Sequence, residues 1–250
     1  MMRTKVAASH HDNHAASPAP PVAPHKPVRT LVIDIGGTGI KGMVLNEIGE
    51  PIKERKRTAT PRSGKPDDVI AAIRKLADEL RPFHRVSIGF PGVVRSGVVR
   101  DAVNLAPQWK DFNLTKALES KFKKPVRAAN DADVQGFGAI SGKGVELVLT
   151  LGTGVGSSLF VDGRLVPNVE VGKAKLSDEE LHRVGKKRWN RRLGKLVGKL
   201  EAMFHYDRLY IGGGNAETVN ISLLPGNVTI VSNLNGLLGG IALWNDASRP

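Results

Sequence analysis

Two glycine-rich segments, each directly after an apolar run, are the first candidates for chemistry in this sequence. The glycines are Gly36, Gly37 and Gly39 in the first segment and Gly152, Gly154 and Gly156 in the second. Glycine leaves backbone N–H groups without a side chain in the way, so a phosphate group can approach closely. One such turn alone is equally typical of a β-hairpin. Two of them in corresponding positions favour a phosphate donor that is held from both sides.

Two aspartates stand where predicted strands end. Asp34 closes the apolar run at 29–35, where a Mg²⁺ ion and its water ligands would sit; the alternative is an aspartate that caps the turn. Asp131 follows a predicted strand at 126–129, and side chains at such strand ends point into the crevice of an α/β sheet. Phosphoryl transfer needs one base near the acceptor hydroxyl, and Asp131 is the candidate. The alternative for Asp131 is an ordinary helix N-cap.

The elements that must position these residues occur twice in the same order. The first pass has strands at 29–35, up to 45, at 52–58, 85–90 and 126–129, with helices from about 66 and at 113–122. The second pass begins near 145, with strands at 147–151 and 157–161 and a helix at 188–204. The segments 31–36 and 147–152 have the same pattern, a strand that ends in a glycine turn. We predict an internal duplication of a βββα unit and an α/β fold.

The net charge of +13 predicts a polyanionic partner such as nucleic acid, an anionic surface or a phosphate-rich substrate. Residues 173–199 hold ten Lys/Arg against three Asp/Glu, so the charge is local. The predicted helix at 188–204 has an apolar face and a basic face. The apolar residues are Trp189, Leu193, Leu196, Val197, Leu200 and Met203, and the basic ones are Lys187, Arg191, Lys195 and Lys199. The basic face is either solvated or a track for a polyanion chain.

Composition excludes several kinds of site. The chain has no cysteine, which removes disulfides, thiolate metal sites and a cysteine nucleophile. No apolar run is long enough to cross a bilayer, so we expect no membrane partner and a cytoplasmic location. Residues 1–27 are rich in Ala, Pro, Ser and His, and we predict a disordered tail.

Taken together, the motifs resemble those of ROK-family sugar kinases. The segment 34–42, Asp-Ile-Gly-Gly-Thr-Gly-Ile-Lys-Gly, resembles the first phosphate motif of that family, and its ending resembles the polyphosphate glucokinase branch. Pro91-Gly92-Val93-Val94, Asn104-Leu105, Asn130-Asp131-Ala132, the segment 151–156 and Ile211-Gly212-Gly213-Gly214 follow in the family's order. The resemblance spans about residues 28–245.

The resemblance implies a duplicated ribonuclease-H-like (actin-like ATPase) fold with two domains around a cleft, at 28–128 and 129–250, the final helix packing back on the first domain. It implies a kinase that transfers a phosphoryl group from polyphosphate and/or ATP to the 6-hydroxyl of a hexose, most simply glucose, with Asp131 as general base. The donor-phosphate residues would be Asp34, Gly36, Gly37, Thr38, Gly39, Lys41, Gly152, Thr153, Gly154 and Gly156, with Mg²⁺ held by Asp34 through water. Gly212, Gly213 and Gly214 would face the nucleotide, and the sugar-binding residues would be Gly92, Asn104, Asn130, Asp131, Glu170 and Lys173.

The sequence departs from the family pattern at the sugar loop and at the zinc motif. Lys173 stands where the family's Glu-x-Gly-His sugar loop has histidine, and the cysteine-rich zinc motif of most ATP-using relatives is absent, so no zinc is expected. Lys173 also supports an alternative function. In this alternative the protein has the same fold, is catalytically impaired, and binds polyphosphate or nucleic acid through its basic helix. Because the family commonly dimerises, we expect a homodimer; we do not expect nucleic acid as the main partner.

Overall fold

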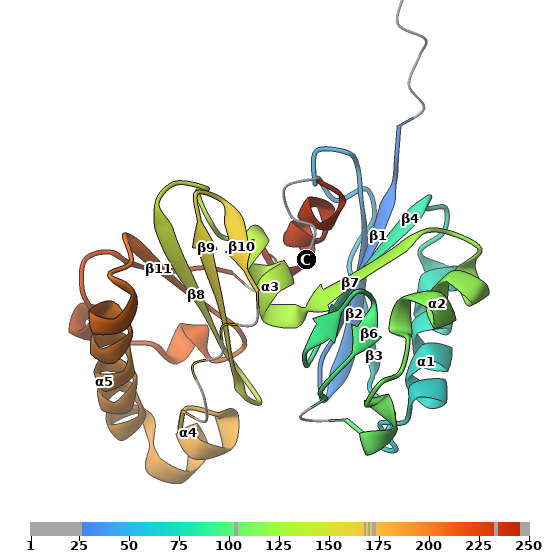
Figure 1. Ribbon diagram of the computed structural model, residues 1–250. Coiled ribbons are helices and arrows are strands. Elements are labelled where there is room, and N and C mark those ends of the chain that lie inside the picture. Colours follow the sequence, from blue (N-terminus) through green and yellow to red (C-terminus); the bar gives the residue numbers. More distant parts are fainter. Residues whose placement is uncertain are drawn as a thin grey trace, which may run out of the picture.

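The computed structural model describes residues 27–102, 105–167, 169, 171, 174–232 and 235–245. Its strands form two five-stranded sheets that lie side by side, with a short helix between them (Figure 1). The predicted tail at 1–27 lies, apart from Pro27, outside the described residues. Within the described ranges, every helix is too short or too polar to cross a membrane.

The first sheet has the strand order β3-β2-β1-β4-β7. Its strands are β1 (Thr30–Ile35), β2 (Gly39–Leu45), β3 (Lys56–Ala59), β4 (Arg85–Phe90) and β7 (Val126–Asn130). β1, β2 and β3 pair antiparallel, whereas β4 and β7 run parallel to β1. A small hairpin of β5 (Val94–Arg95) and β6 (Val98–Val99) follows β4. The strands predicted at 29–35, up to 45, at 85–90 and at 126–129 are confirmed.

The third strand is shorter than predicted. The sequence predicts a strand at 52–58, but β3 begins only at Lys56 and pairs with residues 39–42 of β2. Pro51 forms an isolated bridge with Leu45, and the exposed residues 52–55 follow outside any strand. Between this bridge and β3 the segment 51–56 has two residues more than the partner segment 42–45, so it bulges out of the ladder, which resumes at Lys56.

The second sheet repeats the first. Its strands are β8 (Val145–Leu151), β9 (Val155–Val161), β10 (Arg164–Val166), β11 (Arg208–Gly212) and β12 (Val228–Ile230), in the order β10-β9-β8-β11-β12. β8, β9 and β10 pair antiparallel, and β11 and β12 run parallel to β8. Strand order and direction therefore match the first sheet, which confirms the predicted duplication. The domain boundaries at 28–128 and 129–250 stay a prediction.

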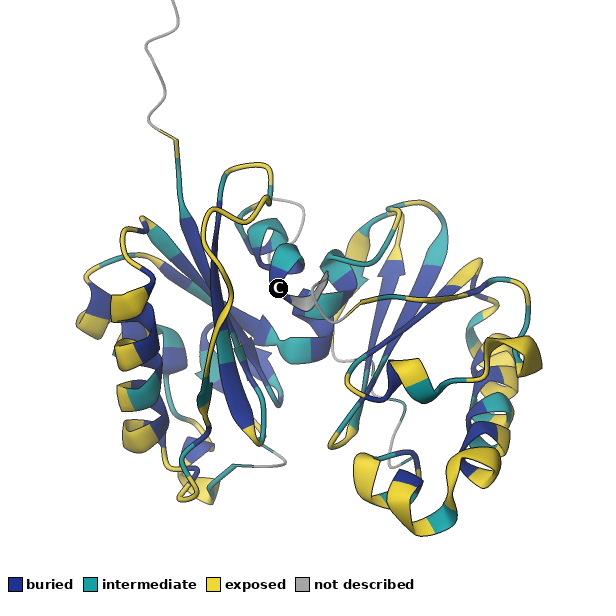
Figure 2. Ribbon diagram, turned by 180° about the vertical axis from the view of Figure 1, so that it is seen from behind, coloured by how far each residue is buried: buried dark blue, intermediate teal, exposed yellow. Residues whose placement is uncertain are grey.

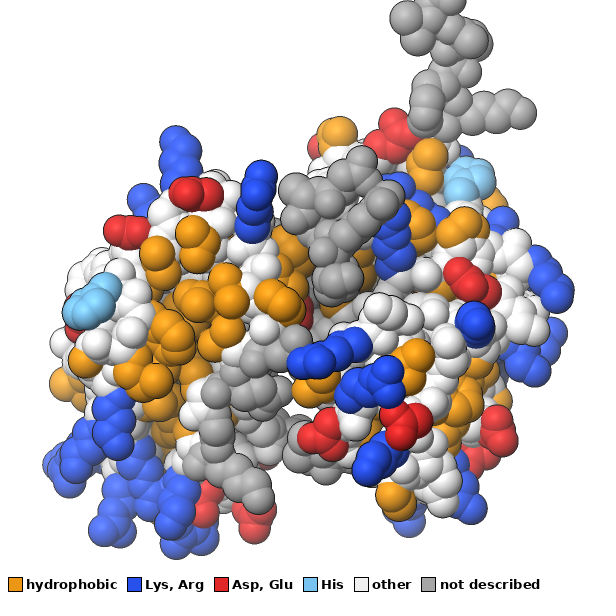
Figure 3. Space-filling model, viewed as in Figure 1, with side chains coloured by type: hydrophobic (Ala, Val, Ile, Leu, Met, Phe, Trp, Pro, Cys, Tyr) orange, Lys and Arg blue, Asp and Glu red, His pale blue; other side chains and the backbone are white. Residues whose placement is uncertain are grey.

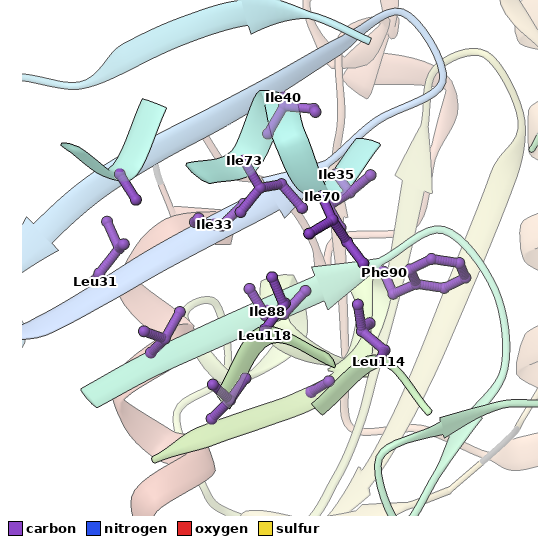
Figure 4. Packing of buried hydrophobic residues seen from close by; sticks show 14 of the residues in the cluster. Leu31, Ile33, Ile35, Ile40, Ile70, Ile73, Ile88, Phe90, Leu114 and Leu118 are labelled. Atoms are coloured by element: carbon purple, nitrogen blue, oxygen red, sulfur yellow. The ribbon is translucent and has the colours of Figure 1, made fainter. Parts of the chain in front are cut away.

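Two helices cover one face of the first sheet, α1 (Pro66–Glu79) and α2 (Leu114–Phe122). Proline at the first position and Asp67 and Asp68 in the first turn favour the start of α1, because that end lacks hydrogen-bond acceptors and is positively polarised. The buried stripe of α1 packs on the apolar side chains of β1 and β4, as Figure 4 shows for part of the core.

The second sheet is covered on its outer face by α4 (Asp178–Val184) and α5 (Lys186–Phe204). Trp189, Leu193 and Val197 of α5 are fully buried against this sheet, and the opposite side of the helix is exposed (Figure 2). One residue of the predicted apolar face is misplaced: Met203 is 69% exposed. It lies in the last turn of the helix, at the margin of the apolar stripe.

The short helix α3 (Asp131–Phe137) lies between the two sheets and contacts strands of both. The C-terminal segment, made of α6 (Asn235–Leu238) and a 3₁₀ helix (Gly239–Trp244), packs against α3 and against the other face of the first sheet. Ser87 of β4 donates a hydrogen bond to the Gly240 carbonyl (2.7 Å) and accepts one from the Trp244 indole (2.8 Å). The segment thus fixes α3 relative to β4.

The C-terminal segment packs so closely on α3 that we expect Gly239 to tolerate no side chain. A Cβ atom there would lie 1.9 Å from the backbone oxygen of Val134 in α3. We expect Gly239→Ala to lower the free energy of unfolding by about 1–3 kcal/mol, because backbone must move to admit the methyl group. Chemical denaturation would measure this. The matched control is Gly198→Ala in α5, where no neighbouring atom lies within 4 Å and we expect a gain of about 0.4–1 kcal/mol. An unchanged stability of Gly239→Ala would contradict the close packing.

Candidate active site

The parallel pairing of β1, β4 and β7 brings the two predicted aspartates together. Asp34 in β1 is opposite Gly89 in β4, and Asp131 follows directly after β7. A Cβ atom at Gly89 would lie 3.4 Å from Cα of Asp131 and 3.7 Å from Oδ1 of Asp34. Gly89 is therefore the spacer between the two carboxylates. Sequence reasoning missed it, although a glycine inside an apolar strand is a signal of close approach.

The charge of Asp34 is balanced by a cross-strand neighbour. Nζ of Lys41 in β2 lies 3.2 Å from Oδ2 of Asp34, and both side chains are mostly buried. Arg57 in β3 is the next partner in the same row, opposite Lys41. Two cations in adjacent strands repel each other unless an anion lies between them, so this row suits a phosphate group.

Asp131 has a carboxyl group that is close to half-ionised at neutral pH. Burial and, second, the negative charge of Asp34 raise the pKa of Asp131 to about 7. The backbone N–H of Ala132, which donates to Oδ1 of Asp131 at 2.9 Å, opposes this shift. A carboxyl group with such a pKa can accept a proton efficiently near pH 7.

The N-cap of α3 is Asn130. Its Oδ1 accepts hydrogen bonds from the backbone N–H groups of Ala132 (2.8 Å) and Asp133 (3.3 Å). Its Nδ2 donates to the carbonyl of Gly92 (3.1 Å), which leaves the second Nδ2 hydrogen for another acceptor. The capping function that could have explained Asp131 thus falls largely to its neighbour.

The first glycine turn is closed by a hydrogen bond within the turn and by a second one from the residue that follows β3. The N–H of Gly36 donates to the Gly39 carbonyl (3.0 Å), and the hydroxyl of Thr60 donates to the Gly36 carbonyl (2.6 Å). A Cβ atom at Gly39 would lie 2.7 Å from Nε of Arg57, so the guanidinium rests over the turn. Arg57 is a second residue that sequence reasoning missed, because it is distant along the chain and lies in the strand whose start was predicted too early.

The second and third glycine segments meet at the ends of β8 and β11. The N–H of Gly152 donates to the Gly154 carbonyl (3.0 Å), and the N–H of Asn215 donates to the Leu151 carbonyl (2.9 Å). Gly213 has a φ of +92°, and a Cβ atom there would lie 2.3 Å from the Leu151 oxygen. Only glycine fits this contact. The predicted donor-side and nucleotide-side segments are therefore neighbours in space.

Part of the predicted sugar site lies outside the described residues: Asn104, Glu170 and Lys173. The two residues that flank Glu170 are nevertheless tied to β9. The Ser157 hydroxyl donates to the Val169 carbonyl (2.7 Å) and accepts from the Val171 N–H (3.1 Å). Ser157 is a third residue that sequence reasoning missed, and it anchors the backbone on both sides of the loop.

The described residues contain no cluster of three or more histidine, cysteine, aspartate or glutamate side chains suited to hold a metal. A Mg²⁺ ion bound through water by one carboxylate and by donor oxygens needs no such cluster. Oδ2 of Asp34 accepts from Lys41, and its Oδ1 faces the space beside Gly89. This donor set fits a water-mediated Mg²⁺ ion.

Comparison with known proteins gives consistent matches. The ROK family model matches residues 30–174. A polyphosphate glucokinase of Mycobacterium leprae is 28% identical over 236 residues, covering 84% of this chain and 73% of the relative. The crystal structure of inorganic polyphosphate/ATP-glucomannokinase from Arthrobacter sp. strain KM has a TM-score of 0.79 at 31% identity, covering 88% of this chain and all of that one. A ROK glucokinase of Streptomyces griseus shares the fold with a TM-score of 0.73 at 20% identity, covering 86% and 98% of the two chains.

These neighbours share the actin-like ATPase fold, which confirms the fold class expected from the sequence.

The electrostatics of the two aspartates can be measured directly. We expect the carboxyl carbon of Asp131 to titrate with a midpoint of about 7 in ¹³C NMR spectra. In Asp34→Asn the midpoint should fall, because a negative charge beside Asp131 is removed. The control is Asp111→Asn, which removes an exposed carboxylate paired with Arg100 in the same half of the chain and should leave the midpoint unchanged. A wild-type midpoint near the ordinary aspartate value would contradict the raised pKa of Asp131, and an unchanged midpoint in Asp34→Asn would show that the two carboxylates do not interact.

Proposed function

Because the chain belongs to the ROK family, we propose that it is a phosphotransferase that moves a phosphoryl group from polyphosphate and/or ATP to the 6-hydroxyl of a hexose, with glucose as the expected sugar. The similar proteins support this assignment, since they are a polyphosphate glucokinase and a polyphosphate/ATP-glucomannokinase. The observation that carries the proposal is the carboxylate pair of Asp34 and Asp131 beside two glycine turns.

In the proposed reaction Asp131 is the general base. The sugar 6-hydroxyl gives its proton to the Asp131 carboxylate while its oxygen forms a bond to the terminal phosphorus of the donor. The bond from that phosphorus to the bridging oxygen breaks, and the leaving phosphate keeps the electron pair. A pKa of about 7 keeps a large share of Asp131 ionised at neutral pH and still basic enough to take the proton.

We assign the donor phosphate to the two glycine turns, with Thr38 and Thr153 among them. Lys41 and Arg57 would balance its charge from the first sheet, and Gly212, Gly213 and Gly214 would face a nucleotide when ATP is the donor. Mg²⁺, held by Asp34 through water, would neutralise charge on the donor oxygens.

The sugar would lie on the Asn130 side of Asp131. The amide of Asn130 has one N–H left for a sugar hydroxyl, and its bond to Gly92 fixes the direction of that N–H. Asn104, Glu170 and Lys173 stay proposed sugar ligands, and the homodimer and the cytoplasmic location also stay predictions.

A coupled assay with glucose and each donor tests the proposal. We expect glucose 6-phosphate with polyphosphate, with ATP or with both. Lys173 supports the alternative of a polyanion-binding protein without kinase activity, and the absence of product with either donor, together with retained polyphosphate binding, would favour it.

The role of Asp131 is tested by Asp131→Asn. We expect turnover to fall by about 10²–10⁴-fold, the usual contribution of a positioned base, with little change in sugar affinity. The wild-type rate should rise as the pH passes through about 7, because only ionised Asp131 accepts a proton, and this limb should vanish in the variant. Wild-type turnover in Asp131→Asn would overturn the mechanism.

The loop anchored by Ser157 is tested by Glu170→Ala. We expect the KM for the sugar to rise by roughly tenfold or more, because a charged acceptor for sugar hydroxyls is worth about 1.5–3 kcal/mol. Calorimetry on both proteins gives the sugar affinity without turnover. Equal affinities would remove Glu170 from the sugar site.

A further inference from the structure

A cavity of about 470 Å³ opens between helix α5 and the 3₁₀ helix Ile221–Leu223, outside the site described above. Four of its six lining residues are polar or charged residues of α5. The lining residues are Lys187, Asn190, Arg191, Gly194, Lys195 and Leu223. Figure 3 shows Lys and Arg side chains gathered over the lower end of α5.

The cations of this groove are uncompensated. Lys187, Arg191 and Lys195 are exposed, and within the described part of the chain none of them forms an ion pair. Arg192 of the same helix differs, because its guanidinium is paired with Glu180 at 2.6 Å. Glu201 is the single acidic residue of α5, which contains seven Lys and Arg.

This arrangement is unfavourable for the helix itself. Lysines in the first turn oppose the helix dipole, and no acidic residue stands there to offset them. Like charges four residues apart, as in 187, 191 and 195, also repel each other. An anion in the groove would reverse both effects.

Gly194 keeps the groove open. Glycine is unfavourable in the interior of a helix. Packing does not require glycine at position 194, because a Cβ atom there would lie 3.9 Å from its nearest neighbour, the backbone oxygen of Leu223. A larger side chain at 194 would occupy the space between the lysines and Leu223.

The groove is connected to the segment that follows the third glycine motif. Helix α5 packs on the second sheet, and β11, the next strand along the chain, ends at Gly212. Asn190 connects the two directly: its Nδ2 donates to the Thr218 carbonyl (3.0 Å), and its Oδ1 accepts from the Asn220 N–H (2.7 Å). From there the cations continue along the helix to Lys199.

We propose that this groove binds the linear polyphosphate chain whose terminal phosphoryl group enters the active site. The inference rests on the proposed function and adds a subsite to it. Cations repeat at every fourth residue of α5, about 6 Å apart along the helix axis, which suits an unbroken row of phosphate charges. A single-stranded nucleic acid is less suited, because no aromatic side chain lines the cavity for base stacking.

The test measures binding of end-labelled linear polyphosphate by fluorescence anisotropy, beside the coupled assay. The groove variant is Lys187→Gln/Arg191→Gln/Lys195→Gln. The control, Lys110→Gln/Lys116→Gln/Lys121→Gln, removes the same charge from exposed positions at and near α2 in the other half. We expect the groove variant to lose about 10–100-fold in polyphosphate affinity, its salt slope to fall by about 0.7 per lost contact, and its KM for ATP to change much less. The control should keep wild-type affinity.

Gly194→Gln provides a second variant that leaves the charge unchanged. Glutamine favours a helix more than glycine does, so the fold should be retained while the groove is filled, and polyphosphate affinity should fall. Equal losses in the groove and control variants, or competition by an oligonucleotide as strong as that by polyphosphate, would overturn the inference. Activity with ATP but no polyphosphate binding would overturn the groove and leave the kinase. Polyphosphate binding lost in the groove variant, without activity in the wild type, would support the groove and overturn the kinase.

Discussion

The site depends on one constraint, the parallel pairing of β1, β4 and β7 with a glycine in the middle strand. This pairing sets Asp34 and Asp131 on either side of Gly89, close enough for one carboxylate to raise the pKa of the other. Two carboxylates at such a separation would be costly without neighbouring positive charge. Lys41 supplies it on the Asp34 side, which leaves Asp131 as the group whose protonation changes near neutral pH.

The position of Asp131 also depends on packing far from it. Asp131 begins α3, and α3 is held between the two sheets by strands on both sides and by the C-terminal segment. The ring of Trp244 in that segment contacts both Arg85 and Arg127, whose guanidinium carbons are 4.8 Å and 4.5 Å from the ring centre, and its indole N–H donates a hydrogen bond to Ser87 in β4. The end of the chain therefore stabilises the strands that carry the site.

The two halves share a topology but use it differently. The first sheet provides both carboxylates and has its second face covered by the C-terminal segment. The second sheet provides two neighbouring glycine segments, and α5 on its outer face carries the uncompensated cations. The duplicated scaffold thus carries the pair of carboxylates in one half and the uncompensated cations of α5 in the other.

The local sequence patterns predicted most strands of the first sheet, the first two strands of the second sheet, the helices α1, α2 and α5, the duplication and the residues of the glycine turns. Apolar runs, helical periodicity and turn glycines are local signals, and they predicted β1, β4, α1 and the apolar side of α5 closely. The tertiary structure was needed to show that Gly89 separates the carboxylates, that Arg57 rests over the first turn and that Ser157 anchors the backbone of residues 169 and 171. It also decided that Asn130, not Asp131, caps α3. These relations join strands that are distant along the chain, and register and packing, which no local pattern encodes, bring them together.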